Sequence, residues 1–217
     1  MVRCGDADAM ICGVEGNFIS HLHYVRDIIG ARAGLEDVAA VTMLILKKGT
    51  YFLTDTHVGM NPSPAQIADN TALAAELVAG FGIEPKAALL SHSNFGSRIT
   101  EHSEKMRQTL RIVREKYPHI LVEGEMHADA ALSQEIRDRL FKNAAFDGEA
   151  NLLVCPSLNA ANIAYNMTKV LADGVPVGPM LVGTNYPAHI LTESTTVRGI
   201  VNMAAFAAVD AISRKQG

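Results

Sequence analysis

The stretch over residues 151–192 constrains the fold more than any other, because a strand, a helix and a second strand are expected there in immediate succession. Residues 151–155 form a short apolar run that Pro156 closes, which is typical of a buried strand that ends there. Asn159 is expected to cap the helix that follows. The residues at helical spacing in that helix are Ala161, Ala164, Tyr165, Thr168 and Leu171.

Gly174 and Pro176 are expected to end this helix, and residues 177–182 then form a second buried strand. A unit of this kind favours parallel strands with the crossover helix packed on one face of the sheet. Ligands of α/β proteins bind at the loops that follow such strands. Those loops are residues 156–159 and 183–187, which are rich in serine, threonine and asparagine.

Four further motifs lie in and after this stretch: A-A-N-I-A-Y-N at 160–166, V-G-P at 177–179, P-A-H-I-L-T at 187–192 and T-V-R-G-I-V-N at 196–202. With T-D-T-H-V-G-M-N-P-S-P at 54–64 and the segment at 82–97, they make the chain similar to the phosphate acetyl/butyryl transferase (phosphotransacetylase) family. It resembles still more the phosphotransacetylase-like C-terminal region of bacterial multidomain malic enzymes. The resemblance covers nearly the whole chain.

The resemblance implies an α/β fold, a layered α/β/α arrangement with a mixed, mostly parallel sheet, as in phosphotransacetylases and proteins similar to isocitrate and isopropylmalate dehydrogenases. It also implies that residues 1–217 are the C-terminal part of a phosphotransacetylase-like domain, with the N-terminal part and the malic enzyme module outside. That module would use NADP and Mg or Mn. Its chemistry is not encoded here, since the sequence has neither a strand–GxGxxG–helix unit nor a metal-ligand motif.

Elsewhere the hydrophobic pattern alternates between strands and helices, which independently favours an α/β layered fold. Ser63, Pro64 and Gln66 predict a helix start with a capping box. The strands are expected at residues 7–12, 38–46, 51–54, 86–91 and 120–122, with the second and third as an antiparallel hairpin, and helices at 18–29 and 129–140. A C-terminal helix is expected to face inward through Val197, Ile200, Val201, Ala204, Ala208 and Ile212.

Bulk properties exclude several classes of partner. The formal net charge of −4 leaves no basic footprint for nucleic acid. No apolar run approaches the ~18 residues that a membrane span needs, and residues 1–13 lack the long apolar stretch of a signal peptide. Cys4, Cys12 and Cys155 are odd in number and widely spaced, which predicts a reduced, cytoplasmic environment.

The segment at residues 91–98, S-H-S-N-F-G-S-R, is the best candidate for an anion site. It joins a strand to a helix, and its hydroxyls, backbone N–H groups and Arg98 could converge on phosphate. The alternative is that Gly96, Ser97 and Thr100 shape a turn and cap a helix. The resemblance favours the first interpretation, because related enzymes use a similar loop near phosphate.

Three other groups of polar residues are better explained as structural. Glu123, Glu125, His127 and Asp129 contain acids and bases but match no strong metal motif. His21 and His23 face different sides of a helix, which makes a shared ligand improbable. The sequence Asp-Thr-His at residues 55–57 suggests a dyad but lacks an accompanying nucleophile motif.

The segment at residues 191–199 decides between an active and an inactive transferase. This segment resembles the pattern L-S-R-G-x-S-x-x-D of active phosphotransacetylases. In that pattern the serine contacts the coenzyme A thiol, the arginine binds acyl phosphate, and the aspartate helps to deprotonate the thiol. The corresponding positions here are Thr192, Glu193 and a residue at or next to Gly199. A carboxylate in place of the guanidinium would repel a dianionic acyl phosphate. No local base remains for a thiol of pKa ~8.5.

The leading prediction is therefore a noncatalytic regulatory and oligomerisation domain of an NADP-dependent malic enzyme, with acetyl-coenzyme A as effector and a homodimer or higher homo-oligomer as its assembly. An active phosphate acetyltransferase with a rearranged site is the alternative, and a purely structural dimerisation module is a third. No catalytic residue, metal ligand or bound cofactor is assigned to this chain. The predicted ligand-binding residues are Ser91, Ser93, Asn94, Gly96, Ser97, Arg98, Asn159, Asn162, Thr184, Pro187 and Thr192.

Overall fold

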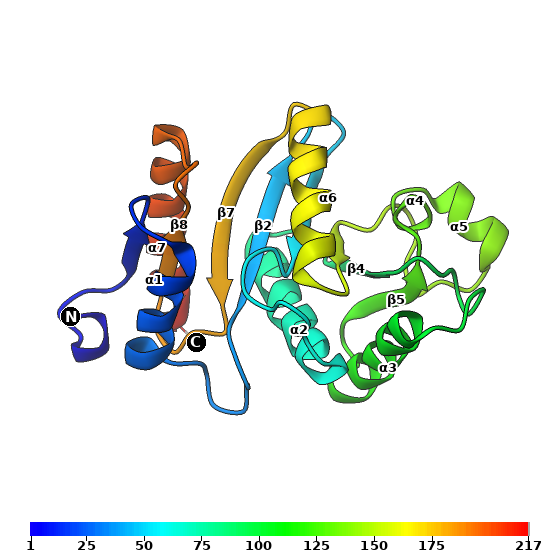
Figure 1. Ribbon diagram of the computed structural model, residues 1–217, viewed down its shortest axis with the longest axis horizontal. Helices are drawn as coiled ribbons and strands as arrows, with labels where there is room; N and C mark the ends of the chain where they lie inside the picture. The colour runs from blue at the N-terminus through cyan, green and yellow to red at the C-terminus, as the bar shows by residue number, and fades with distance from the viewer. Residues whose placement is uncertain (217) are drawn as a thin grey trace.

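Strand pairing divides the chain into two groups of elements, which Figure 1 shows beside each other in a computed structural model that describes residues 1–216. The larger group is built on a six-stranded sheet of order β5-β4-β6-β3-β2-β7, and the smaller one on the pair β1-β8. The strands are β1 (Met10–Gly13), β2 (Ala39–Ile45), β3 (Thr50–Thr54), β4 (Lys86–Leu90), β5 (Leu121–Met126), β6 (Leu152–Val154), β7 (Val175–Val182) and β8 (Ala188–Leu191).

The large sheet is mixed and mostly parallel, as predicted. β3, β6, β4 and β5 pair in parallel, whereas β2 is antiparallel to both β3 and β7. The predicted hairpin is therefore confirmed. β7 runs in the same direction as β6, so the predicted crossover through α6 (Leu158–Leu171) joins parallel strands, although β3 and β2 lie between them.

Helices cover both faces of this sheet and give the predicted α/β/α layers. On one face α2 (Pro64–Gly80) and α3 (Glu101–Lys116) pack over Phe52, Leu89 and Leu152. On the other, α4 (Ala128–Ala131) and α6 pack near Leu53 and Met126. α5 (Gln134–Leu140) follows α4 at the edge of this layer.

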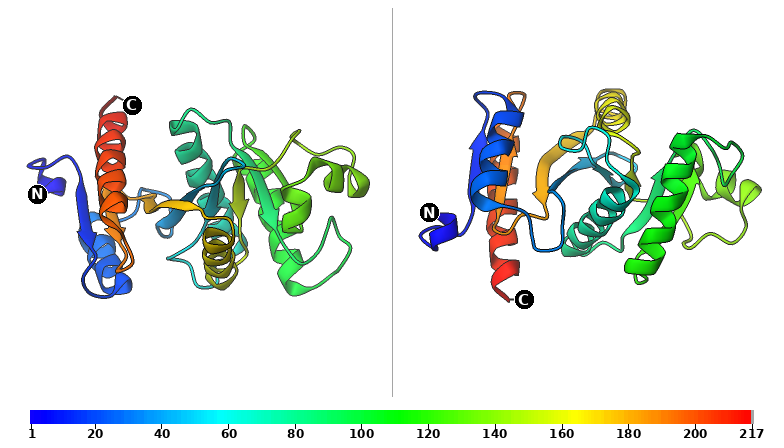
Figure 2. Two further views of the ribbon diagram at one scale, coloured as in Figure 1. Left: turned by 90° about the horizontal axis from the view of Figure 1, so that it is seen from above. Right: turned by 60° about the horizontal axis from the view of Figure 1, so that its bottom comes forward.

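The smaller group combines both ends of the chain, as both views in Figure 2 show. The parallel pair β1-β8 lies between α1 (Phe18–Tyr24) and α7 (Val197–Gln216), with η1 (Val2–Cys4) at the start. The helix predicted over 18–29 is α1 followed by the π-helical turn η2 (Val25–Ile29). None of the helices described is both long and apolar enough to cross a bilayer.

Of two helix caps predicted from the sequence, the one at α2 is confirmed and the one at α6 is wrong. Ser63 and Gln66 form the predicted capping box at the start of α2. At α6, however, Ser157 is the cap, and its hydroxyl accepts the Ala160 N–H. Asn159 does not cap, because the extended backbone that a cap requires occurs two residues earlier and Asn159 already lies inside the helix.

The predicted inner face of α7 is also wrong for the single chain. The helix instead buries Met203, Ala207 and Ala211, while Val197 and Val201 are 78% and 62% exposed. Apolar residues occur on several sides of this helix, so periodicity alone cannot select the buried side. α6 has a comparable exposed apolar face, formed by Ile163, Met167, Val170 and Leu171.

Candidate functional site

The carboxyl ends of β3, β6 and β4 lie beside one another, and α2, α6 and α3 follow them. The loop after β3 is bonded to the two neighbouring helices: Lys105 Nζ of α3 donates to Asn61 Oδ1 at 2.8 Å, and Leu158 N of α6 donates to Met60 O at 3.3 Å. This edge of the sheet is where α/β proteins bind ligands. It contains the predicted loop at residues 91–98.

A buried carboxylate occupies the centre of the 91–98 loop. Glu125, which is 1% exposed, accepts hydrogen bonds through Oε1 from Ser93 Oγ at 2.7 Å and from Gly96 N at 2.9 Å. Ser93 Oγ also accepts from Arg98 N at 3.1 Å. Two donors that were predicted to hold an external anion therefore bind an anion supplied by the protein.

The remaining residues of the loop are held in the same internal network. Ser97 Oγ accepts from Asn94 N at 2.9 Å, and Asn94 Oδ1 accepts from His127 N at 2.7 Å. Thr100 caps α3, as the structural alternative predicted. Arg98 is different, because its side chain is exposed and forms no hydrogen bond or ion pair with residues 1–216.

Asn159 and Asn162 lie in the first two turns of α6. Asn159 is exposed, whereas Asn162 is half-buried and accepts a hydrogen bond from Asn166 Nδ2 at 3.1 Å. Asn166 in turn accepts from Lys169, so the row of polar groups follows the helix. Asn159 is thus the more accessible member of the predicted pair.

Thr184 belongs to a partly buried polar network that was not predicted from the sequence. Arg214 Nη1 donates to Thr184 O at 2.6 Å, and the same guanidinium donates to both oxygens of Asp210. Nε2 of the buried His189 lies 3.4 Å from Asp210 Oδ2. Burial alone would raise the pKa of Asp210, but His189 and Arg214 together outweigh it and lower this pKa. The i, i+4 spacing of Asp210 and Arg214 was the available signal.

Thr192 lies far from Thr184 in space, although the two residues are only eight positions apart in the sequence. Thr184 contacts the last turns of α7 through Arg214, whereas Thr192 precedes its first turn and shares hydrogen bonds with Ser194 and Thr195. The intervening helix spans about 25 Å. Pro187, midway between them, is buried, and its carbonyl accepts from Met10 N. The predicted residues therefore do not converge on one compact pocket.

Asp55 and His57 meet through the backbone N–H of His57, and no hydrogen bond joins their two side chains. The Asp55 carboxylate accepts the backbone N–H groups of Ala40, His57, Val58 and Gly59 at 2.7–3.1 Å. Its burial raises its pKa against the effect of these donors. Burial and the charge of Lys169 lower the pKa of His57 to about 4.

The acidic residues of β5 are also bonded within the protein. Glu123 accepts from Arg114 and from Ala145 N, and Glu125 holds the 91–98 loop. Across residues 1–216, no three histidine, cysteine, aspartate or glutamate side chains are grouped to hold a metal ion.

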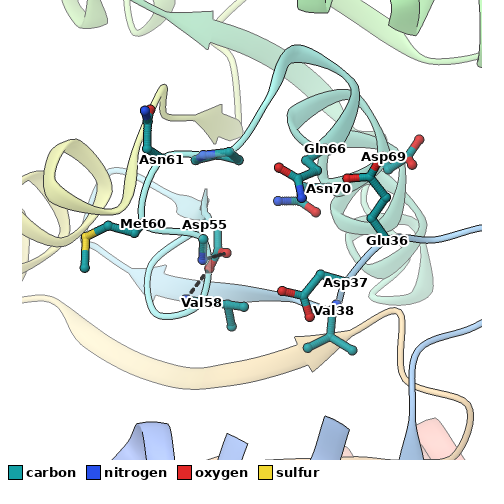
Figure 3. A pocket seen from close by; sticks show the side chains of 12 residues that line it. Glu36, Asp37, Val38, Asp55, Val58, Met60, Asn61, Gln66, Asp69 and Asn70 are labelled. Carbon is teal, nitrogen blue, oxygen red and sulfur yellow. Dashed lines mark hydrogen bonds between the residues drawn. The ribbon is translucent and has the colours of Figure 1, made fainter. Parts of the chain in front are cut away.

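Two cavities, among others, were not foreseen. One of about 890 Å³ lies between α2, β7 and α7; its walls include Phe81, Phe206 and Val209, and Arg198 also lines it. The other, of about 210 Å³, lies beside Asp55 and is shown in Figure 3. Asn70 lines this smaller pocket, and a single asparagine inside a helix gives no signal in the sequence.

Comparison with known proteins decides the family. The pattern of the phosphate acetyl/butaryl transferase family matches residues 1–208. The chain belongs to this family. A phosphotransacetylase from Streptococcus pyogenes has the same fold, with a TM-score of 0.93 and 28% identity, over 98% of this chain and 65% of that protein.

Malic enzymes are similar to this chain over almost its whole length. It is 51% identical to the NAD-dependent malic enzyme of Rhizobium meliloti and 47% identical to the NADP-dependent malic enzyme of Salmonella typhimurium. These matches cover 96–97% of this chain but 27–28% of the malic enzymes. The phosphate acetyltransferase of Acetivibrio thermocellus is 30% identical, and 66% of it is covered.

Proposed function

We propose that this chain is the noncatalytic regulatory and oligomerisation domain of a malic enzyme, with acetyl-coenzyme A as its effector. The observation that carries the proposal is the match of nearly the whole chain to about a quarter of two malic enzymes. The remaining three quarters of those relatives have room for a separate catalytic module. One of these relatives is named for NAD and the other for NADP. The proposed parent uses NADP, Mg or Mn, and is cytoplasmic.

The segment at residues 191–199 supports the noncatalytic part of the proposal. Glu193 is exposed, and its carboxylate forms no ion pair or hydrogen bond with the rest of the described chain. No internal cation therefore cancels its charge, and an acyl phosphate that approached the Thr192 hydroxyl would be repelled. The Gly199 N–H donates to Thr196 Oγ1, so this position contributes to the start of α7 and provides no carboxylate.

Arg98 supports the effector part of the proposal. Acetyl-coenzyme A carries several phosphate charges, and an arginine is well suited to bind them. Arg98 lies at the carboxyl edge of the sheet, and no carboxylate of the described residues neutralises it. To regulate, the ligand must bind two conformational states of the parent with different affinity.

The exposed apolar faces support self-association. Val201 on α7 and Val170 on α6 are 62% and 69% exposed, and several apolar neighbours surround each on the same helix. Apolar patches of this kind commonly mark protein interfaces. A homodimer that covers the face of α7 would bury the side that the sequence pattern predicted to be inward.

The proposal is tested with the full-length parent in two assays on one preparation. We expect malate oxidation to fall as acetyl-coenzyme A is added, and we expect no acetyl transfer from acetyl phosphate to coenzyme A. Thioester formation at ordinary enzyme rates would favour the alternative, an active acetyltransferase. Malate oxidation that ignores acetyl-coenzyme A would leave the oligomerisation role alone.

A further inference from the structure

The cavity of about 890 Å³ between α2, β7 and α7 is long and mostly apolar. Its lining residues on α7 run from Arg198 to Arg214, a length of about 24 Å along the helix axis. Phe81 at the end of α2 and Phe206 on α7 both line it, and their rings stack with centroids 5.9 Å apart. Pockets that hold small organic molecules are of this size and are lined mainly by apolar side chains.

Several apolar side chains of this lining are accessible to water. Phe81, Ile45 and Val209 are 39%, 41% and 55% exposed. Removing apolar surface from water is favourable in proportion to the area covered. The lining therefore favours a ligand with an extended apolar body.

The charged residues that line the cavity leave one positive charge in excess. Arg32 forms an ion pair with Glu76 at 2.9 Å, and Arg214 forms one with Asp210 at 2.8 Å. Arg198 also lines the cavity, but it is exposed and forms no hydrogen bond or ion pair with residues 1–216. The excess charge therefore belongs to Arg198.

The position of Arg198 in α7 makes this charge a favourable partner for an anion. Arg198 is the second residue of α7, and the first turn of this helix contains no acidic residue. The amino-terminal end of a helix is positive, so it repels a cation and attracts an anion. Glu193 precedes the helix, but it does not line the cavity and forms no ion pair with Arg198 in the described chain.

From this arrangement we infer that the cavity binds an organic anion with one negative charge and an apolar tail, namely a medium-chain carboxylate. The carboxylate would pair with Arg198 and accept a hydrogen bond from the side-chain amide of Asn202, which lines the cavity one turn later. The tail would lie along α7 beside Phe206 and Val209. This inference goes beyond the proposed function, because Arg98 and the other predicted effector contacts do not line this cavity.

Other occupants fit the cavity less well. Acetyl-coenzyme A carries several phosphate charges, whereas the cavity offers one arginine that is not already paired with a carboxylate. An organic cation would meet a lining with an excess of positive charge, which is unfavourable. A second copy of the chain could instead cover the apolar wall, and the experiment distinguishes this case.

The test is an NMR titration of the 217-residue chain with octanoate, followed through the amide signals. We expect the side-chain amide of Asn202 and the backbone N–H of Val177 to shift with a dissociation constant on the order of millimolar, as for other small ligands. Octyltrimethylammonium has the same tail and the opposite charge, and it should bind at least tenfold more weakly. Equal binding of the two ions, or shifts that miss the lining residues, would overturn the inference. Shifts that appear only when the chain is diluted to a monomer would assign the cavity to a second copy, and would overturn it as well.

Two variants identify the residues responsible. Arg198→Gln should raise the dissociation constant for octanoate about tenfold or more, because it removes a charged donor, and should leave the binding of uncharged octanol unchanged. Arg139→Gln removes the same charge from an exposed position of α5 and should leave octanoate binding unchanged. Val209→Glu places a carboxylate on the cavity wall and should abolish octanoate binding. If Val209→Glu fails to fold, the exposed Arg198→Gln decides alone, and unchanged octanoate binding by that variant would refute the site.

Discussion

Glu125 provides the sharpest test of how the 91–98 loop is held. In Glu125→Ala, Ser93 Oγ and Gly96 N lose a charged acceptor at 2.7 and 2.9 Å. Hydrogen bonds to charged groups contribute roughly 1.5–3 kcal/mol each. The variant also no longer buries a carboxylate, which offsets part of the loss. We expect the free energy of unfolding to fall by about 3 kcal/mol, which lowers Tm by roughly 6–12 °C in a chain of this size.

Glu125→Gln separates the charge of this side chain from its shape. The amide keeps an acceptor oxygen for both donors, so the expected loss is about 1 kcal/mol. Urea unfolding followed by circular dichroism measures both variants, and Glu135→Ala is the control because Glu135 is an exposed residue of α5. If Glu125→Ala costs no more than that control, the carboxylate does not hold the loop. Inorganic phosphate should also stabilise Glu125→Ala more than wild type, because the donors become free.

Two further predictions concern pH and assembly. The pKa of His57 is lowered from 6.5 to about 4, so the stability that depends on its neutral form is complete above pH 6.5 and falls by up to about 3 kcal/mol as the pH drops to 4. The variant His57→Gln should therefore show a flatter pH dependence when the free energy of unfolding is measured with urea from pH 7 to 4. The same pH dependence in wild type and variant would contradict this prediction. Val201→Glu places a charge on the exposed apolar face of α7 and should shift the sedimentation coefficient of the protein toward that of a monomer. The control Gln108→Glu adds the same charge at an exposed position of α3 and should leave the sedimentation coefficient unchanged. A wild-type protein that is monomeric at micromolar concentration would contradict the proposed assembly.

The fold was largely predictable because its signals are local. The capping box at Ser63, the hairpin of β2 and β3 and the layered architecture all follow from turn chemistry and hydrophobic periodicity. The errors arose where several local solutions compete. Asn159 and Ser157 are both good caps, and α7 is apolar on several sides, so tertiary packing made the choice.

The candidate site was less predictable, because its geometry depends on residues distant in sequence. The 91–98 loop was found from its own residues, but its anion comes from Glu125 on β5. Thr184 was predicted from the loop after its strand and Thr192 from the resemblance to the family motif, yet α7 separates their surroundings. The pocket beside Asp55 becomes visible only when the segment before β2, the loop after β3 and the start of α2 come together.

The central claim is that this domain senses acetyl-coenzyme A for a malic enzyme, and an effector titration tests it most directly. Malate oxidation by the full-length parent is measured against acetyl-coenzyme A for wild type, Arg98→Ala and the control Arg139→Ala, an exposed arginine of α5. The account predicts inhibition of wild type and of the control at the same concentrations. Arg98→Ala should need ten- to hundredfold more effector, with uninhibited turnover unchanged. Superimposable curves would remove Arg98 from the site, and a wild type indifferent to acetyl-coenzyme A would contradict the regulatory function itself.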